Sequence, residues 1–424
     1  MGAFNGKILN EMTERRRDLH RYPETGWTEF RTTAKVAEVL RALGYFVHFG
    51  GEFIRPEHVM GWNIDVVAEK KRAIEQGADP AIVDEIGDYT GLYAELDTGE
   101  SGPVTVLRFD IDCVDTTETT DENHLPAKLG FASVNPGRMH SCGHDGHTAI
   151  GLALAELLKE DASLKGKIRF LFQPAEEGVR GGYAMTMAGL ADDADYFIAM
   201  HLGLGKPTGE VYGGVDGFFC TTKLDADFTG FGAHAGGEPQ KGRNALLAAA
   251  AAALNLHAIA PHSGGATRIN VGVLKAGEGR NVVASKAHMK IETRGETDEL
   301  AAYVYGRAAE ILEGAAQMYG VELKMTKQGE ANRADSSPEL ALRVADAAKT
   351  VEGVTFAGES RPMAGSDDAC HFMKRVQENG GQATYVGIGA TTTAGHHNNA
   401  FDFDEAAMPI ALGVLYKAVK RING

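Results

Sequence analysis

The chain has 424 residues, of which 43% are hydrophobic and 24% charged, and this composition is typical of a globular protein with a large apolar core. Its length exceeds that of one ordinary domain and predicts two or three. The formal net charge of −16 argues against binding of a nucleic-acid backbone or an anionic membrane as the main activity. An anionic small substrate stays compatible with this charge, because a local pocket can be basic on an acidic protein.

The cysteines and the N-terminal segment bear on the cellular compartment. The four cysteines are widely spaced and form no CxxC pair, so a disulfide framework is not expected. Residues 1–6 lack the apolar core of a signal peptide. The longest apolar run, residues 245–254, is about half of a membrane span. We therefore expect a cytoplasmic protein.

Helix and strand patterns alternate through the first half of the chain. Residues 7–43 have helical composition, interrupted by the turn at 22–26. Segment 50–90 is looser and mostly helical in composition, and we interpret it as an insertion. Strands are expected at 45–49 and 91–96. The apolar runs at 103–109, 167–172 and 196–200 predict buried strands, as in a parallel sheet. The Ala- and Leu-rich run at 148–158 predicts a helix, and another is expected at 181–188.

Near residue 220 the pattern changes to the alternation of antiparallel strands. A strand, a helix, two strands, a helix and a strand are expected at 221–228, 244–259, 267–274, 287–294, 300–319 and 321–325. The chain then returns to the first domain through helix 337–350, strand 383–389 and helix 405–422. The predicted fold class is α/β, with a doubly wound mixed sheet in a catalytic domain (1–219 plus 330–424) and an inserted α+β, ferredoxin-like satellite or dimerisation domain (220–329).

The run Met139–His147 carries the densest chemistry in the sequence, with a thiol, three imidazoles and a carboxylate. Cys142 and His144 stand two positions apart, and a thiolate with an imidazole suits a borderline divalent ion such as zinc or manganese. For Cys142 alone, a buried structural cysteine is the simpler interpretation. The hypothesis of a metal site therefore depends on whether further ligands lie downstream.

Side chains that can bind metal follow three separate predicted strands, and the carboxyl ends of parallel strands meet at one edge of a sheet. One of two adjacent glutamates can bind metal while its neighbour transfers a proton. An acid behind a ligand can fix the tautomer of a ligating histidine. In chain order the candidates are Asp110, Asp112 and Asp115, then Glu176 and Glu177, then His201, and finally the pair His396–His397. For Asp110 and Asp115, an exposed acidic loop is an equally good interpretation.

Taken together, these motifs resemble the M20 family of dinuclear metallo-amidohydrolases, in the branch that has a cysteine ligand. The resemblance covers essentially the whole chain, including the insertion, and rests on runs such as Asp145–Gly151, Phe172–Gly178 and Phe401–Glu405. It implies the following metal ligands: Cys142, His144, Glu177, His201 and His397.

The choice within the pair 396–397 stays open at this level. The family spacing, four residues before Phe401, selects His397. Where the branch usually has a proline shortly after this histidine, the present chain has Asn398 and Asn399, so His396 is kept as the alternative.

The resemblance also implies roles for residues that do not bind metal. Glu176 matches the general acid/base, and Asp112 matches the acid behind a ligand. His234 matches a satellite-domain histidine that reaches the active site of a partner subunit, where it would also help to stabilise the oxyanion; in its glycine-rich turn, it could instead be an exposed turn residue. Asn281 and Arg294 match residues that hold the substrate carboxylate.

Two further positions carry their own expectations. Arg294 could pair with Glu292 on the same strand in place of a substrate. Phe109 stands where the family commonly has a small residue, and we expect it to narrow the site.

The activity implied by the resemblance is metal-dependent hydrolysis of the amide bond of an N-acylated amino acid. The first substrate is p-aminobenzoyl-glutamate, cleaved to p-aminobenzoate and glutamate. One alternative is an N-acyl-amino-acid hydrolase of the hippurate or indole-3-acetyl-aspartate type, and another is a non-catalytic binding subunit of a hydrolase complex. The implied cofactors are two divalent metal ions, Mn2+ in preference to Zn2+, and the implied assembly is a homodimer or a heterodimer with a homologous B-type subunit.

Overall fold

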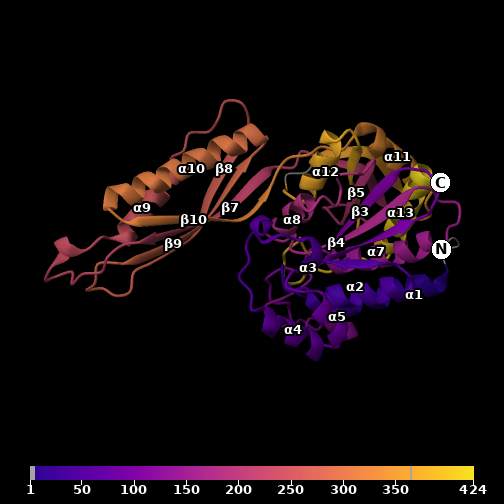
Figure 1. Cartoon of the computed structure of the whole chain (residues 1–424), viewed down its shortest axis with the longest axis horizontal. Coiled ribbons are helices and arrows are strands. Elements are labelled where there is room, and N and C mark those ends of the chain that lie inside the picture. The colour runs from indigo at the N-terminus through magenta and orange to yellow at the C-terminus, as the bar shows by residue number, and fades with distance from the viewer. Residues whose placement is uncertain (1–4, 363–364) are drawn as a thin grey trace. The chain divides into compact units, whose positions relative to one another are not determined.

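The computed structural model describes residues 5–362 and 365–424, which form two compact units (Figure 1). The smaller unit comprises Gly217–Arg333 with the short segment 365–367, and the larger unit comprises the other described residues. Each unit has its own sheet and its own apolar core. The predicted α/β fold with an inserted α+β unit is thereby confirmed.

The larger unit is built on a mixed sheet with the strand order β1-β2-β4-β3-β5-β12-β6-β11. Its centre, from β4 through β3 and β5 to β12, is parallel, whereas β1, β2 and the β12–β6 pair are antiparallel. The strands span Val47–Phe49 (β1), Leu92–Asp97 (β2), Val104–Asp110 (β3), Lys167–Gln173 (β4), Tyr196–Leu202 (β5), Glu210–Asp216 (β6), Phe356–Pro362 (β11) and Gln382–Ile388 (β12).

Helices cover this sheet and bury its apolar side chains. Helix α7 contacts β3, β4 and β5 and also packs against α1 and α13, while α8 packs against α12. Apolar residues of α7 and of the strands share one core cluster, which includes Leu154, Leu107 and Phe170. The helices span Gly6–Arg21 (α1), Phe30–Ala42 (α2), Leu125–Leu129 (α6), His144–Lys159 (α7), Gly181–Met187 (α8), Pro338–Ala348 (α11), Ala369–Glu378 (α12) and Ala407–Asn423 (α13).

The segment interpreted as an insertion is made of short helices. These are α3 (Gly50–Phe53), a 3-10 turn at Pro56–His58, α4 (Val66–Glu75) and α5 (Pro80–Glu85). Asp65 caps α4 by accepting a hydrogen bond from the Ala68 N–H, and Asp79 caps α5 by accepting one from the Ala81 N–H. Both helices contact α2, which fixes the insertion on the larger unit.

The smaller unit has the order of elements β-α-β-β-α-β and an antiparallel sheet with the strand order β10-β7-β9-β8. This arrangement is ferredoxin-like, as predicted. Helices α9 and α10 pack against each other and on the sheet, around a core that includes Phe228, Met289 and Leu312. The elements span Cys220–Thr229 (β7), Ala245–His257 (α9), Thr267–Ala276 (β8), Lys286–Gly295 (β9), Asp298–Tyr319 (α10) and Glu322–Ala331 (β10).

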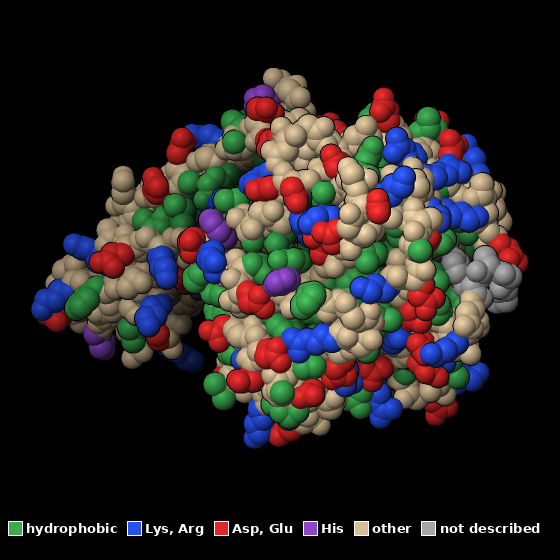
Figure 2. All heavy atoms as spheres, turned by 45° about the vertical axis from the view of Figure 1, so that its right-hand side comes forward, with side chains coloured by type: hydrophobic (Ala, Val, Ile, Leu, Met, Phe, Trp, Pro, Cys, Tyr) green, Lys and Arg blue, Asp and Glu red, His purple; other side chains and the backbone are tan. Residues whose placement is uncertain are grey.

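The molecular surface carries charges of both signs. Acidic and basic side chains are interspersed on the face that Figure 2 shows. Within the described part of the chain, no helix combines the length and the apolar character that crossing a membrane requires.

Candidate metal centre

The neighbouring parallel strands β4, β3 and β5 end at one edge of the sheet, and α7 begins there. His144 is the first residue of α7, and Gly143 before it has a left-handed φ of 97°, which lets the chain turn sharply into the helix. The turn after β4 carries Glu176 and Glu177, and β5 carries His201. Residues that are far apart in the sequence therefore meet at this edge, as predicted from the strand ends.

Cys142, His144 and His201 form a buried group whose possible ligand atoms all lie within 4.8 Å of one another. The Sγ atom of Cys142 is 3.5 Å from Nε2 of His201. His201 donates from Nδ1 to the carbonyl oxygen of Leu202 at 2.7 Å, and His144 donates from Nδ1 to the carbonyl oxygen of Asp112 at 2.9 Å. In the neutral rings these bonds leave the Nε2 lone pairs free to bind a metal ion.

The Nε2 atom of His144 is buried, and it has no hydrogen-bond partner among the residues that the structure describes. A buried nitrogen in this state is costly unless something else binds it. Thiolate sulfur with imidazole nitrogen is a donor set for zinc or manganese. The residues present therefore fit the metal ions that the sequence implies.

Glu177 and His397 form a second group with Cys142, again with possible ligand atoms within 4.8 Å of one another. Glu177 Oε1 is 3.3 Å from His397 Nε2, and the Glu177 N–H donates to Asp112 Oδ2 at 2.8 Å. The His397 N–H donates to the Ser141 carbonyl oxygen at 2.8 Å, which ties the His397 loop to the cysteine motif. The structure thus brings together all five predicted ligands.

His396, the alternative ligand, lies differently. Its Nε2 atom accepts a hydrogen bond from the Leu204 N–H at 3.3 Å, and its ring packs against Phe401. His396 is not among the groups of possible ligands that the described residues form, whereas His397 is. The geometry therefore favours His397.

Glu176 lies beside the ligands and is 9% exposed. It groups with His144 and Glu177, and its Oε2 atom is 3.9 Å from His144 Nε2. Ala175, just before it, has a left-handed φ of 52°, so the chain turns sharply before the glutamates. The Ala175 N–H donates to the buried carboxylate of Glu29 at 2.7 Å, which holds the turn in place.

Asp110, one of the candidate acids, pairs with the buried His147, and this pairing was not predicted. The Leu202 N–H donates to His147 Nε2 at 3.0 Å, so His147 donates from Nδ1 to Asp110 Oδ1, at 2.5 Å. Asp110 is 0% exposed, so the interpretation as an exposed acidic loop is wrong for it, whereas Asp115 is exposed. The sequence spacing could have indicated that His147 belongs to the site, because a residue three positions after His144 lies on the same face of the helix.

The surroundings set the protonation of the metal-free site. Burial, with the charge of Glu177, raises the pKa of the Cys142 thiol. Burial, with nearby His147, lowers the pKa of His201, so this imidazole is neutral and able to bind metal. Metal binding at Cys142 would therefore release a proton.

The remaining predicted residues lie on the smaller unit. His234 Nδ1 accepts hydrogen bonds from the N–H groups of Gly236 at 3.1 Å and Gly237 at 2.9 Å. The neutral ring therefore carries its proton on Nε2, as a donor would need. The Ala235 N–H donates to the Asn281 carbonyl oxygen at 3.0 Å, so the loop segments that carry His234 and Asn281 lie side by side.

Arg294 pairs with Glu292 through two hydrogen bonds of 3.1 Å, which confirms the alternative interpretation of this residue. Its Nη1 atom also lies 3.4 Å from the Ser366 hydroxyl oxygen. Binding of a substrate carboxylate by Arg294 stays a prediction, and it would have to compete with Glu292.

Phe109 does not narrow the site, and that expectation is wrong. Its ring is 2% exposed and packs against Phe172, with 5.7 Å between ring centroids. A Cβ atom built on Gly151 of α7 would lie 2.8 Å from the Phe109 ring, so α7 approaches this side chain closely. Phe109 alternates with Asp110 along β3 and therefore points into the core.

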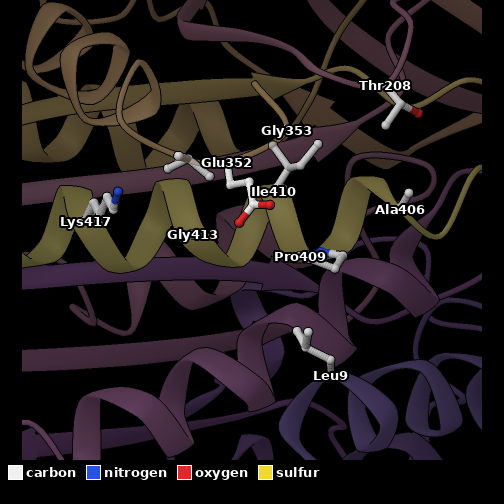
Figure 3. Close-up of a pocket in the computed structure, with 10 residues that line it drawn as sticks. Leu9, Thr208, Glu352, Gly353, Ala406, Pro409, Ile410, Gly413 and Lys417 are labelled. Atoms are coloured by element: carbon white, nitrogen blue, oxygen red, sulfur yellow. The ribbon is translucent and has the colours of Figure 1, made fainter. Parts of the chain in front are cut away.

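A separate groove of about 330 Å3 lies along α13 (Figure 3). It is lined mainly by apolar groups, with Leu9, Pro409 and Ile410 among them, and by Lys417. None of the predicted site residues lines this groove. We therefore locate the candidate site from the chemistry of its side chains, and this groove is distinct from it.

Comparison with known proteins identifies the family. Residues 106–421 match the model of peptidase family M20/M25/M40. The chain belongs to this family. Indole-3-acetyl-aspartic acid hydrolase of Enterobacter agglomerans is 51% identical to this M20 chain over 420 residues, which are 98% of the chain and 96% of the relative. The A-type subunit of p-aminobenzoyl-glutamate hydrolase from Escherichia coli (strain K12) is 48% identical over 420 residues, with the same coverage of 98% and 96%.

A solved structure agrees with these relatives. The crystal structure of an aminobenzoyl-glutamate utilization protein from Klebsiella pneumoniae matches with a TM-score of 0.85 and 42% identity, over 98% of this chain and 96% of that one. The predicted M20 membership and the resemblance to the A-type subunit of p-aminobenzoyl-glutamate hydrolase are confirmed. The chain is accordingly a hydrolase of amide bonds.

Proposed function

We propose that this M20 hydrolase cleaves the amide bond between an aromatic acyl group and an acidic amino acid, with p-aminobenzoyl-glutamate as the first substrate. The observation that carries the proposal is the convergence of ligand atoms around Cys142, which belongs to two groups of possible ligands. The names of the 51% and 48% identical relatives supply the substrate class. Indole-3-acetyl-aspartate is the second candidate substrate. The relative named for it is 51% identical to this chain, and the relative named for p-aminobenzoyl-glutamate is 48% identical.

We infer that Cys142, His144, Glu177, His201 and His397 hold two divalent metal ions, Mn2+ in preference to Zn2+. Thiolate, imidazole and carboxylate ligands suit both metals. When bound, such ions polarise an amide carbonyl and lower the pKa of water toward neutrality. The carboxylate of Asp112 orients two of these proposed ligands, because it accepts hydrogen bonds from the Glu177 N–H and from Nδ1 of His144.

Glu176 is proposed as the general acid/base. It accepts the proton of the attacking water and returns it to the nitrogen of the leaving amine, so that no net proton is consumed in this exchange. Glu176 is 9% exposed, and its Oε2 atom lies 3.9 Å from Nε2 of His144, which leaves its carboxylate within reach of a water molecule at the proposed metal centre.

His234 is proposed as the donor to the oxyanion of the tetrahedral intermediate. Its Nδ1 atom is occupied by two backbone N–H groups, so its Nε2–H is the free donor. The resemblance implies that His234 acts in the site of a partner subunit, with Asn281 and Arg294 on the substrate carboxylate.

The decisive assay uses chelator-treated protein reloaded with Mn2+ or Zn2+ and measures the release of amino acid. The panel is p-aminobenzoyl-glutamate, indole-3-acetyl-aspartate, hippurate and N-acetyl-glutamate. We expect metal-dependent cleavage, fastest for one of the first two. If the metal-loaded chain binds p-aminobenzoate but cleaves none of the four, the proposal is wrong and the chain is a non-catalytic subunit.

A dimer, either with a second copy or with a homologous B-type subunit, is proposed through the smaller unit. Strand β8 is an edge strand of the sheet, and an open edge can pair with another chain. Beside it, α9 exposes 44% of Leu247 and 77% of Leu254, and Leu274 of β8 is 41% exposed. Leu254→Glu should lower the mass measured by light scattering from dimer to monomer, and an unchanged dimer would contradict this interface.

A reducing, cytoplasmic location is proposed on the same chemical grounds. All four cysteines are buried thiols: Cys113, Cys142, Cys220 and Cys370. A thiol in a metal-binding group is preserved in a reducing compartment.

A further inference from the structure

Both tryptophans of the chain lie in one aromatic cluster with Tyr89. The ring centroids are 5.9 Å apart for Trp27 and Trp62, 4.7 Å for Trp62 and Tyr89, and 6.3 Å for Trp27 and Tyr89. Trp27 is 0% exposed, whereas Trp62 and Tyr89 are partly exposed. The proposed hydrolytic chemistry does not use this aromatic cluster.

The residue before Trp62 is tied to a predicted metal ligand. Arg180 donates from Nε to the carbonyl oxygen of Glu177 at 3.0 Å and from Nη1 to the carbonyl oxygen of Gly61 at 3.4 Å. One guanidinium therefore bridges the loop that carries Trp62 and the turn that carries Glu177.

The residue before Trp27 packs on the same turn. A Cβ atom built on Gly26 would lie 3.0 Å from the Cα atom of Ala175, so the two backbones are in direct contact. Trp27 has a left-handed φ of 71° and donates from Nε1 to the Met60 carbonyl oxygen at 2.8 Å. This bond ties Trp27 to the loop that carries Trp62 and helps to offset the cost of the left-handed backbone.

The residue after Tyr89 makes a third connection. The Thr90 hydroxyl donates to Glu29 Oε2 at 2.6 Å, and Glu29 Oε1 accepts the Ala175 N–H at 2.7 Å. Strand β2 begins at Leu92, opposite Phe172 near the end of β4, so Tyr89 precedes β2 at the edge of the sheet where the ligands gather.

We propose that the aromatic cluster, with the partly exposed Trp62 as the contact residue, binds the aromatic ring of the acyl group and sets a preference for aryl over acetyl amides. Each of its three residues is next in sequence to one that contacts the turn at 175–177, either directly or through one side chain, which places the cluster near the turn that carries Glu176. A benzene or indole ring can pack on Trp62 in an offset or edge-to-face arrangement, and an acetyl group cannot. The inference rests on the proposed function and names its substrate class.

Steady-state kinetics of Trp62→Ala and Trp62→Phe test this specificity. For p-aminobenzoyl-glutamate, Trp62→Ala should lower kcat/KM by on the order of tenfold, mainly through KM, and Trp62→Phe should restore most of it. For N-acetyl-glutamate both variants should stay within about twofold of the parent chain. Phe46→Ala is the matched control, because Phe46 is an aromatic residue outside the cluster and 86% exposed. Equal losses on both substrates would overturn the proposal.

Tryptophan fluorescence tests the same site without catalysis. In a Trp27→Phe variant, Trp62 is the remaining tryptophan, and titration with benzoate should change its emission in a saturable way, whereas acetate should not. A missing response to benzoate, or an equal response to acetate, would overturn the proposal. This titration also separates the two hypotheses: a chain that cleaves no amide but shows the benzoate response contradicts the proposed function and supports the aryl site.

Discussion

Two adjacent glutamates at one turn are proposed to have different tasks. Both form a group of possible ligands with His144, and Glu177 forms a further group with Cys142 and His397. Glu176→Gln should therefore lower kcat by on the order of a hundredfold to ten-thousandfold while metal content is unchanged, because it removes the proton acceptor alone. Metal content is measured by elemental analysis of the same samples used for kinetics.

Glu177→Gln is the matched variant on the neighbouring side chain. It should lower the metal content as well as the rate, because it replaces an anionic ligand by a neutral one. If the two variants lose the same amount of metal, the division of labour between the glutamates is wrong.

Glu29 is a buried carboxylate whose charge depends on pH. Burial, with the nearby charge of Asp112, raises the pKa of Glu29 from its ordinary 4.5 to about 8. Between these values the folded state binds more protons than the unfolded state, so the contribution of Glu29 to stability is greatest at low pH and is lost as pH rises through about 8.

The neutral variant Glu29→Gln lacks this titration. From about pH 5 to about pH 8, metal-free parent protein should lose stability relative to Glu29→Gln, as measured by urea unfolding. If the free energies of unfolding of the two proteins instead change in parallel over this pH range, Glu29 is ionised throughout it, which would contradict the raised pKa.

At the scale of residues, the convergence of Glu177 and His201 on Cys142 could be predicted, because both lie where strands end at one edge of the sheet. Their role as metal ligands stays a proposal. Asp110 and His147 were missed as a pair, since a carboxylate after a strand looks the same in sequence whether it is exposed or buried. The pairing of Arg294 with Glu292 could be named only as an alternative, because an arginine two residues along a strand from a glutamate can reach either it or a ligand.

At the scale of elements, α1 is fastened to the rest of the larger unit by a buried arginine. Arg16 is 0% exposed and lies 2.9 Å from Asp145, 2.5 Å from Asp402 and 3.1 Å from Glu405. Arg16→Met should lower the free energy of unfolding by about 3–5 kcal/mol, because it leaves buried carboxylates without their cation. Urea unfolding monitored by circular dichroism gives this value.

Arg17, the next residue, provides the matched control. Its side chain is 37% exposed and pairs with Glu405 alone of these three carboxylates. Solvent screens such a pair, so Arg17→Met should cost no more than about 1 kcal/mol. Similar losses for the two variants would contradict the role given to the buried network.

The packing of α11 on β6 depends on a glycine. A Cβ atom on Gly213 would lie 1.9 Å from the carbonyl oxygen of Ala341, so Gly213→Ala should destabilise the fold by about 1–3 kcal/mol. Gly306 in α10 is the control, because a Cβ atom there would meet nothing within 4 Å. Gly306→Ala should instead stabilise by roughly 0.5–1 kcal/mol, as a helix-favouring substitution. The shift in thermal midpoint gives both signs, and a stabilising Gly213→Ala would refute this packing argument.

Three elements of the larger unit, β6, β11 and α12, could not be predicted from the sequence. Strand β6 contains Gly213 and Gly214, which lower strand propensity but are required by the helix above them. Strand β11 contains a glycine, charged residues and a terminal proline, which suit its position at the sheet edge but hide it in the sequence. Helix α12 was also missed, because its ten residues mix apolar and charged side chains without a long run.

At the scale of the whole molecule, the change of hydrophobic period near residue 220 was enough to predict a second kind of fold in the chain. Buried parallel strands have continuous apolar runs, whereas the antiparallel strands of the smaller unit alternate. What periodicity cannot supply is the partner of the smaller unit, since an exposed edge and exposed leucines are compatible with a second copy and with a homologous chain.

The metal centre is tested most directly by the metal stoichiometry of the chelator-treated chain after reloading with Mn2+, measured by native mass spectrometry. We expect two ions per chain, with fewer retained by Cys142→Ser and by His201→Ala and the full number retained by Phe46→Ala. Binding of no metal, or binding that neither substitution changes, would contradict the central claim that these side chains converge on a metal centre.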